Sequence, residues 1–155
     1  ATSNGKKDFG ELFTLNVESM LKSNVVFQGE EMMNAEKSKD MINSIEEMYI
    51  WKLSRCLVND IYRMMSNCKD YGFRDQIQRA AVSIMNNIAE GLYSGYKSRF
   101  IFHLKVTKGS CAEVISMLYL CEDFNHCTKA KRMELQNQIK VISAGCQRLI
   151  ESLKG

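Results

Sequence analysis

The sequence predicts an all-α protein, organised as a four-helix bundle, from three observations. The 155 residues include no proline, and proline breaks the interior of a helix. Apolar residues recur at three- and four-residue spacing, as on one face of an amphipathic helix, in four separate segments. The nine glycines fall mostly at segment ends, where helices commonly stop. A chain of this length fits one domain.

The four predicted helices follow one another with short connections. Their apolar rows extend over about 44–67, 73–91, 96–123 and 129–153. Ser44 and Glu47 form a candidate capping box at the start of the first helix, and Gly91 suits a left-handed cap at the end of the second. Short connections force neighbouring helices to run in opposite directions, and rows spaced by sevens suit shallow crossing angles. We therefore expect an antiparallel up-and-down bundle over residues 44–155.

Residues 1–43 form an N-terminal extension in this prediction. Apolar residues from Phe9 to Leu21 follow helical spacing, so we expect the extension to be helical. Residues 1–49 hold 5 Lys+Arg and 9 Asp+Glu, a net −4, whereas residues 50–155 hold 16 and 9, a net +7. The bundle is therefore basic and its extension acidic.

Basic residues gather at the start of the third predicted helix. Residues 91–112 contain no Asp or Glu. At 100° per residue, Lys97, Lys105 and Lys108 fall within about 80° of one another, and Arg99 points elsewhere. Such a face predicts contacts with the phosphate backbone of RNA or DNA, although a solvated surface explains the same lysines. Few aromatic residues interleave with these lysines, so stacking on single-stranded bases is not expected.

A second basic group opens the fourth predicted helix and consists of Lys129, Lys131 and Arg132. Cations in a first helical turn oppose the helix dipole, which becomes favourable when a polyanion lies nearby. We therefore count this group, together with Arg79 on the second predicted helix, among the candidate nucleic-acid contacts.

The second predicted helix carries a polar row beside its apolar row. Arg79, Ser83, Asn87 and Glu90 follow helical spacing, and Gly91 comes directly after them. Buried amides and carboxylates fix register because a misaligned pairing leaves them unsatisfied, at about 1–3 kcal/mol each. We expect Ser83, Asn87, Glu90 and Gly91 to form a hydrogen-bonded seam, within the bundle or between subunits. Direct contact of Arg79 with nucleic acid is the alternative reading of this row.

Side chains that carry most enzymatic chemistry are scarce. Only two histidines, His103 and His126, are present, and neither has an evident Ser or Cys partner. Paired carboxylates and the Glu-x-x-His pattern of di-metal bundles are missing. We therefore expect no enzymatic activity, no catalytic residue and no cofactor.

The six cysteines include no CxxC pair. Their pattern favours small buried side chains in a reducing cytosol over a disulfide framework. Cys121, His126 and Cys127 lack a fourth ligand at a standard spacing, so no metal site is expected. The sequence shows no signal segment and no apolar run of about eighteen residues. These features predict a cytoplasmic protein that does not contact a membrane.

Two stretches resemble a known family. YGFRDQIQRAAVSIMNNIAEG (Tyr71–Gly91) and KGSCAEV (Lys108–Val114) are similar to motifs of the four-helix-bundle proteins encoded in intervening sequences of bacterial 23S ribosomal RNA genes. The resemblance covers about residues 45–153. The chain departs from the family pattern where Met85 replaces a proline and Arg99 replaces a glutamate.

The resemblance implies a small antiparallel four-helix bundle, assembly into homopentameric rings and no known enzymatic activity. The sequence is also similar to accessory proteins of diversity-generating retroelements, which bind nucleic acid and a reverse transcriptase. We therefore expect a non-enzymatic, homo-oligomeric accessory or scaffold protein, with RNA or DNA and a reverse transcriptase as candidate partners. The alternative is an oligomeric protein–protein adaptor without a nucleic-acid role, in which the extension and its methionines dock a partner helix. These methionines are Met32, Met33, Met41 and Met48.

Overall fold

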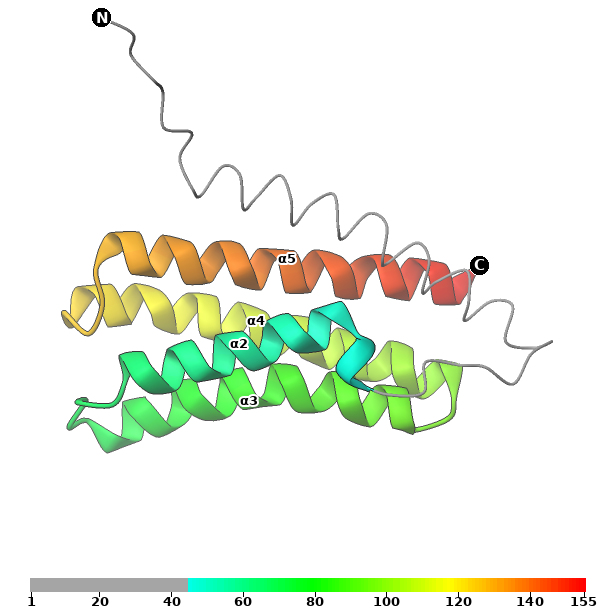
Figure 1. Cartoon of the computed structure of the whole chain (residues 1–155), viewed down its shortest axis with the longest axis horizontal. Coiled ribbons are helices and arrows are strands. Elements are labelled where there is room, and N and C mark those ends of the chain that lie inside the picture. Colours follow the sequence, from blue (N-terminus) through cyan, green and yellow to red (C-terminus); the bar gives the residue numbers. More distant parts are fainter. Residues whose placement is uncertain (1–44) are drawn as a thin grey trace, which may run out of the picture.

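The computed structural model describes residues 45–155, which fold into a bundle of four long helices (Figure 1). A short 3-10 turn, η1 (Ile45–Glu47), precedes α2 (Tyr49–Met64), α3 (Tyr71–Tyr93), α4 (Lys97–Asp123) and α5 (Lys129–Lys154). No strand occurs in this part of the chain, and the prediction of an all-α, four-helix protein is confirmed. The predicted N-terminal extension, residues 1–43, and Ser44 of the candidate capping box lie outside the described residues.

Successive helices of the bundle run in opposite directions (Figure 1). Asn87, in the second half of α3, lies against His103, in the first half of α4, with Asn87 Oδ1 3.0 Å from His103 Nδ1. Lys108 Nζ, in the first half of α4, donates to Gln147 Oε1, in the second half of α5, at 2.6 Å. The first half of α4 therefore lies beside the second halves of α3 and α5. We call this region the α4-start end of the bundle and the opposite region the α4-finish end.

One apolar row from each helix fills the centre of the bundle. Fully buried members of these rows include Leu57, Ile61, Ile77, Ile84, Ile88, Leu104, Leu118, Leu135, Ile139 and Ile142. Removing each such side chain from water contributes about 1.5–3 kcal/mol to folding. The core therefore runs along the whole length of the four helices and holds their surface residues in a fixed arrangement.

Helices α2 and α3 begin at other residues than predicted, because of a buried residue before α2 and a capping side chain before α3. Asp70 Oδ1 accepts a hydrogen bond from the backbone N–H of Phe73 at 3.0 Å, so α3 begins at Tyr71 rather than near residue 73. Helix α2 begins at Tyr49, after the extended and fully buried Met48. The candidate capping box at residues 44–47 therefore does not cap this helix.

Gly91 is not a helix cap, and that prediction is wrong. Helix α3 continues through Gly91 to Tyr93. The left-handed φ of 71° belongs to Gly95, in the turn that leads to α4. Ser94 supports this turn by donating its Oγ–H to the carbonyl oxygen of Gly91 at 2.7 Å. A glycine suits position 95 because L side chains are strained at positive φ.

We expect the thiols to differ sharply in reactivity toward iodoacetamide. Burial raises the pKa of Cys111 and of Cys121 to about 12, whereas Cys56 is exposed on α2. The thiolate is the reactive form, so at a pH of about 8 a thiol with a raised pKa stays protonated and unreactive. Mass spectrometry of the folded protein should find Cys56 alkylated first and Cys111 and Cys121 only after unfolding. Equal labelling of all three in the native state would contradict this burial.

Candidate nucleic-acid interface

The α4-start end presents several cations without acidic partners. Lys97, Arg99 and Lys105 are exposed, and none of them forms an ion pair with another residue of the described part. Lys108 is half-buried because its Nζ is held by the side chain of Gln147. Residues 91–112 lack any acid. The first three turns of α4 therefore carry positive charge that no neighbour on the same helix offsets.

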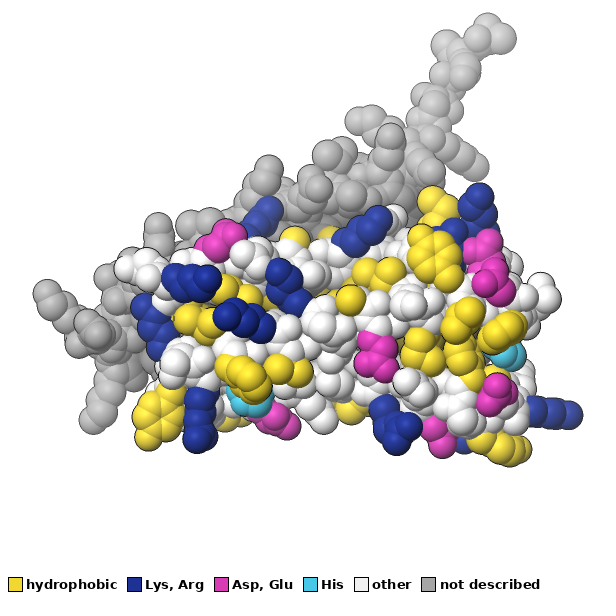
Figure 2. All heavy atoms as spheres, turned by 180° about the vertical axis from the view of Figure 1, so that it is seen from behind, with side chains coloured by type: hydrophobic (Ala, Val, Ile, Leu, Met, Phe, Trp, Pro, Cys, Tyr) yellow, Lys and Arg dark blue, Asp and Glu magenta, His cyan; other side chains and the backbone are white. Residues whose placement is uncertain are grey.

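The charge is unevenly spread over the face that α4 presents. Figure 2 shows Lys and Arg side chains gathered over the half of the bundle in which α4 begins, whereas most of the Asp and Glu in view lie over the other half. Opposite charges that are kept apart in this way leave a positive potential over one end. We give the name α4 basic face to the exposed Lys97, Arg99 and Lys105 together with the half-buried Lys108.

The second basic group does not join this face. Lys129, Lys131 and Arg132 begin α5, at the α4-finish end of the bundle. Lys131 Nζ is bound to Glu134 Oε1 at 2.8 Å, and Lys129 is exposed. The structure therefore separates the two predicted groups by most of the bundle's length.

The side chain of Arg132 is buried between α4 and α5 and is bonded to other residues of the bundle. Its side chain is buried, is hydrogen-bonded to Glu122 on α4 and donates to Gln136 Oε1 at 2.7 Å. Its guanidinium carbon lies 4.5 Å from the ring centroid of Tyr119. The hydrogen bond with Glu122 raises the pKa of Arg132 above its ordinary value. Arg132 joins α4 to α5 and is not available to a phosphate, which corrects its assignment as a nucleic-acid contact.

Arg79 lies apart from the α4 basic face, near the middle of the bundle. It is exposed in a shallow groove between α3 and α4, which is also lined by Ser83 and Glu113. Gln76 Nε2 donates to Glu113 Oε1 across this groove at 3.4 Å. The nearby carboxylate of Glu113 weakens the attraction of Arg79 for an anion. The structure thus does not bring Arg79 together with Lys97 or Lys105.

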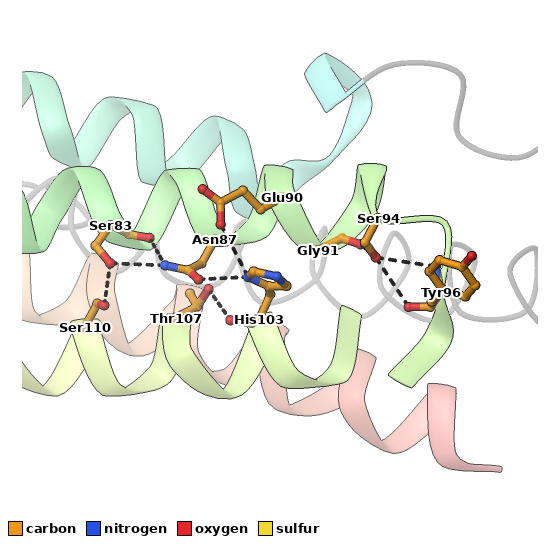
Figure 3. Close-up of polar contacts among 9 residues, drawn as sticks. All are labelled: Ser83, Asn87, Glu90, Gly91, Ser94, Tyr96, His103, Thr107 and Ser110. Atoms are coloured by element: carbon orange, nitrogen blue, oxygen red, sulfur yellow. Dashed lines mark hydrogen bonds and ion pairs between the residues drawn. The ribbon is translucent and has the colours of Figure 1, made fainter. Parts of the chain in front are cut away.

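The predicted seam residues do come together, and they lie between α3 and α4 of one chain (Figure 3). Asn87 Nδ2 donates to the carbonyl oxygen of Ser83 at 2.9 Å and to its Oγ at 3.1 Å. Asn87 Oδ1 lies 3.0 Å from Nδ1 of His103, which places the imidazole proton on Nδ1 as donor. Ser83 Oγ in turn reaches Ser110 Oγ. Two side chains of α3 are therefore paired with two of α4.

The α4 half of the seam was not identified from the sequence, although a signal was present. Ser83, Asn87 and Glu90 stand at i, i+4 and i+7 on α3, and His103, Thr107 and Ser110 repeat this spacing on α4. Two polar rows of equal spacing on antiparallel helices are able to pair residue by residue. Thr107, the middle residue of the α4 row, donates its Oγ1–H to the carbonyl oxygen of His103 at 3.0 Å.

Glu90 and Gly91 stand at the end of the seam. The Glu90 carboxylate lies 3.6 Å from His103 Nδ1, but its side chain is 63% exposed, so water screens this contact. Gly91 is buried against α4: a Cβ at this position would stand 2.6 Å from Cδ2 of Phe100 and 2.9 Å from Cβ of His103. The absence of a side chain at Gly91 therefore lets the two helices approach closely where the seam ends.

Asn87 is expected to contribute more to stability than Glu90. Asn87→Ala removes the hydrogen bonds to Ser83 and His103 and should lower the free energy of unfolding by about 1–2 kcal/mol. Glu90→Ala removes only a screened contact and serves as the matched control, with an expected change below about 0.5 kcal/mol. Urea unfolding followed by circular dichroism measures both. A larger loss for Glu90→Ala than for Asn87→Ala would contradict the geometry of the seam.

No group of three or more His, Cys, Asp or Glu in residues 45–155 is arranged to hold a metal ion. Cys68 Sγ and His126 Nε2 approach to 3.6 Å at the α4-finish end. Within the same residues, no helix is long and apolar enough to cross a membrane.

These features define the class of protein. Four long helices, joined by short turns and with a polar seam between α3 and α4, form a four-helix bundle whose successive helices run in opposite directions. A model of the 23S rRNA-intervening sequence proteins matches residues 31–148, and the chain belongs to this family. The match begins at Glu31 and therefore extends into the segment predicted as an N-terminal extension.

A solved structure shows the same fold. It is a protein of unknown function from the S23 ribosomal protein family of Bacteroides thetaiotaomicron, with a TM-score of 0.59 and 22% sequence identity. The similarity covers 68% of this chain and 99% of that one. No curated protein matches the sequence.

Proposed function

We propose that the protein is a non-enzymatic, homo-oligomeric accessory or scaffold factor that binds the backbone of RNA or DNA. The observation that carries the proposal is the α4 basic face, where Lys97, Arg99 and Lys105 are exposed and unpaired and where residues 91–112 contain no acid. Phosphate contacts by Lys and Arg provide most of the affinity of proteins that bind nucleic acid without reading its sequence. A cytoplasmic location and a reverse transcriptase as protein partner belong to the same proposal.

Self-association is proposed to use the α4-finish end. Leu120, Phe124 and Met133 are between 41% and 55% exposed there, and Figure 2 shows hydrophobic side chains over this half of the face as well. Exposed apolar residues that gather in one region commonly mark a protein contact. Association through this end would leave the α4 basic faces of several copies free, and a homopentameric ring of the kind that the resemblance implies would add their potentials.

The adaptor alternative loses part of its basis. It relied on four methionines that would dock a partner helix, but Met48 is fully buried in the core of the bundle. The other three, at positions 32, 33 and 41, lie outside the described residues. The α4 basic face has no role in that alternative, so a binding experiment separates the two proposals.

A salt titration tests the proposed function. Fluorescence anisotropy of a labelled oligonucleotide should show binding that weakens by about tenfold or more per protomer when salt rises from about 50 to about 200 mM, because three phosphate contacts release about two to three counterions. Size-exclusion chromatography with light scattering of the same sample measures the oligomeric state. Absence of binding at the lower salt concentration would contradict the proposed function. Binding with an affinity that does not change with salt concentration would contradict the proposed phosphate contacts.

A further inference from the structure

The structure shows a row of exposed side chains on α4 that alternates aromatic rings and cations. We propose that this row, Tyr96, Arg99, Phe102 and Lys105, binds single-stranded nucleic acid, with bases stacked on the two rings and phosphates held by the two cations. The inference rests on the proposed function and specifies its ligand: an unpaired strand rather than a duplex.

The spacing of the row follows from helix geometry. Its members are three residues apart, so each step rises by about 4.5 Å and turns by about 60° around the helix. Neighbouring members therefore lie side by side along one ridge of α4. Tyr96 and Phe102 are 66% and 60% exposed, and both cations are exposed as well. From Tyr96 to Lys105 the row turns through about 180°, so a ligand that contacts all four side chains follows the ridge around α4.

Each aromatic ring of the row has a neighbouring side chain on α4. Tyr96 is the N-cap residue of α4, and its carbonyl oxygen accepts the backbone N–H of Phe100 at 2.9 Å. The Arg99 guanidinium carbon lies 5.8 Å from the Tyr96 ring centroid. The Phe102 ring contacts the His103 ring at a centroid distance of 5.5 Å and an interplanar angle of 81°. His103 itself is held by Asn87 of the seam, so Phe102 stands beside a positioned neighbour.

Exposed rings beside unpaired cations favour a single strand over a duplex. Phosphates are present in both, but only an unpaired strand offers the faces of its bases to aromatic side chains. Figure 2 shows hydrophobic side chains among the Lys and Arg side chains over the half of the bundle where α4 begins. An adenine, uracil or other base stacked on Tyr96 or Phe102 would cover apolar surface that is otherwise in water.

A protein partner fits this row less well. Lysine is depleted from the centres of protein–protein interfaces, and a second copy of the same row would bring like charges together. The apolar residues at the α4-finish end, such as Leu120 and Phe124, carry that role better in the proposed assembly. The sequence did not predict the row because its first ring, Tyr96, stands in the turn before α4 and Arg99 points away from the arc that Lys97, Lys105 and Lys108 share.

Binding of a 12-nucleotide oligouridine and of a duplex of equal length, measured by anisotropy at one salt concentration, tests the inference. The Tyr96→Ala/Phe102→Ala double variant should bind the single strand at least about tenfold more weakly and the duplex within about twofold of the unmodified protein. Tyr62→Ala, at an exposed tyrosine on α2, is the matched control and should bind both as the unmodified protein does. Circular dichroism and light scattering verify fold and mass.

The outcomes separate the inference from the proposed function. If the double variant loses single-strand and duplex binding equally, or loses neither, the stacking row is overturned while phosphate binding stands. A double variant that changes its oligomeric mass would show that the rings form a protein contact, which also overturns the inference. If the unmodified protein binds neither ligand, the proposed function fails and the inference fails with it.

Discussion

Gly91→Ala is expected to lower the free energy of unfolding by about 1–2 kcal/mol, although alanine is the better helix former. The new Cβ would stand 2.6 Å from Cδ2 of the buried Phe100 ring and 2.9 Å from Cβ of His103. Because His103 Cβ is tied to the backbone of α4, the helices themselves must separate. Overpacking of this kind costs about 1–3 kcal/mol, and the gain of up to about 1 kcal/mol in helix propensity offsets only part of it.

Gly109→Ala is the matched control for this prediction. Gly109 also lies within a helix, on the exposed side of α4, and a Cβ there would meet nothing within 4 Å. Only the gain in helix propensity applies, so the free energy of unfolding should rise by about 0.5–1 kcal/mol. Urea denaturation of the two variants should therefore give changes of opposite sign. Equal stabilisation by both would show that α3 and α4 do not meet closely at Gly91.

Charge reversal of the α4 basic face should remove polyanion binding. We expect Lys97→Glu/Lys105→Glu/Lys108→Glu to reduce affinity for RNA by at least about a hundredfold, because each lost phosphate contact costs about fivefold near 0.15 M salt and the new carboxylates repel phosphate. Filter binding or anisotropy measures the loss. Since Lys108 also holds Gln147, the Lys97→Glu/Lys105→Glu double variant shows the effect of charge alone.

A second triple variant controls for net charge. Lys52, Lys69 and Lys140 are exposed and belong to neither predicted basic group, so their replacement by Glu changes the net charge by the same amount. This variant should keep most of the affinity. If it loses as much as the first triple variant, attraction depends on total charge, and the assignment of the α4 basic face is wrong.

Helix positions were predictable because the apolar rows are long and regular. The predicted ranges for the third and fourth segments agree with α4 and α5 to within one residue at each end. The start of α3 depended on Asp70 as a side-chain cap, and the start of α2 on the burial of Met48. Gly91 was misread because a glycine near a helix end has two explanations, a left-handed cap or a close helix contact, and only the path of α4 decides between them.

The candidate site was predicted in part. The row of Ser83, Asn87 and Glu90 was predicted as a polar stripe from its helical spacing. Its partners on α4 could not be predicted, because the sequence does not show which helices pair or in which register. Arg132 was misassigned for the same reason, since its partner Glu122 stands on a different helix and becomes a neighbour only through the turn between α4 and α5. The periodicity of a sequence predicts on which face of its helix a residue lies. The tertiary fold determines which residues of other helices contact that face.

An NMR titration tests the position of the proposed interface most directly. Unlabelled oligouridine would be added to the ¹⁵N-labelled protein, and the shifts of the backbone amide signals would be followed residue by residue. We predict that the largest changes fall on residues 96–108 and the adjoining turn of α5, with little change at Leu120, Phe124 and Met133. Changes confined to the α4-finish end, with residues 96–108 unaffected at saturation, would contradict nucleic-acid binding by the start of α4.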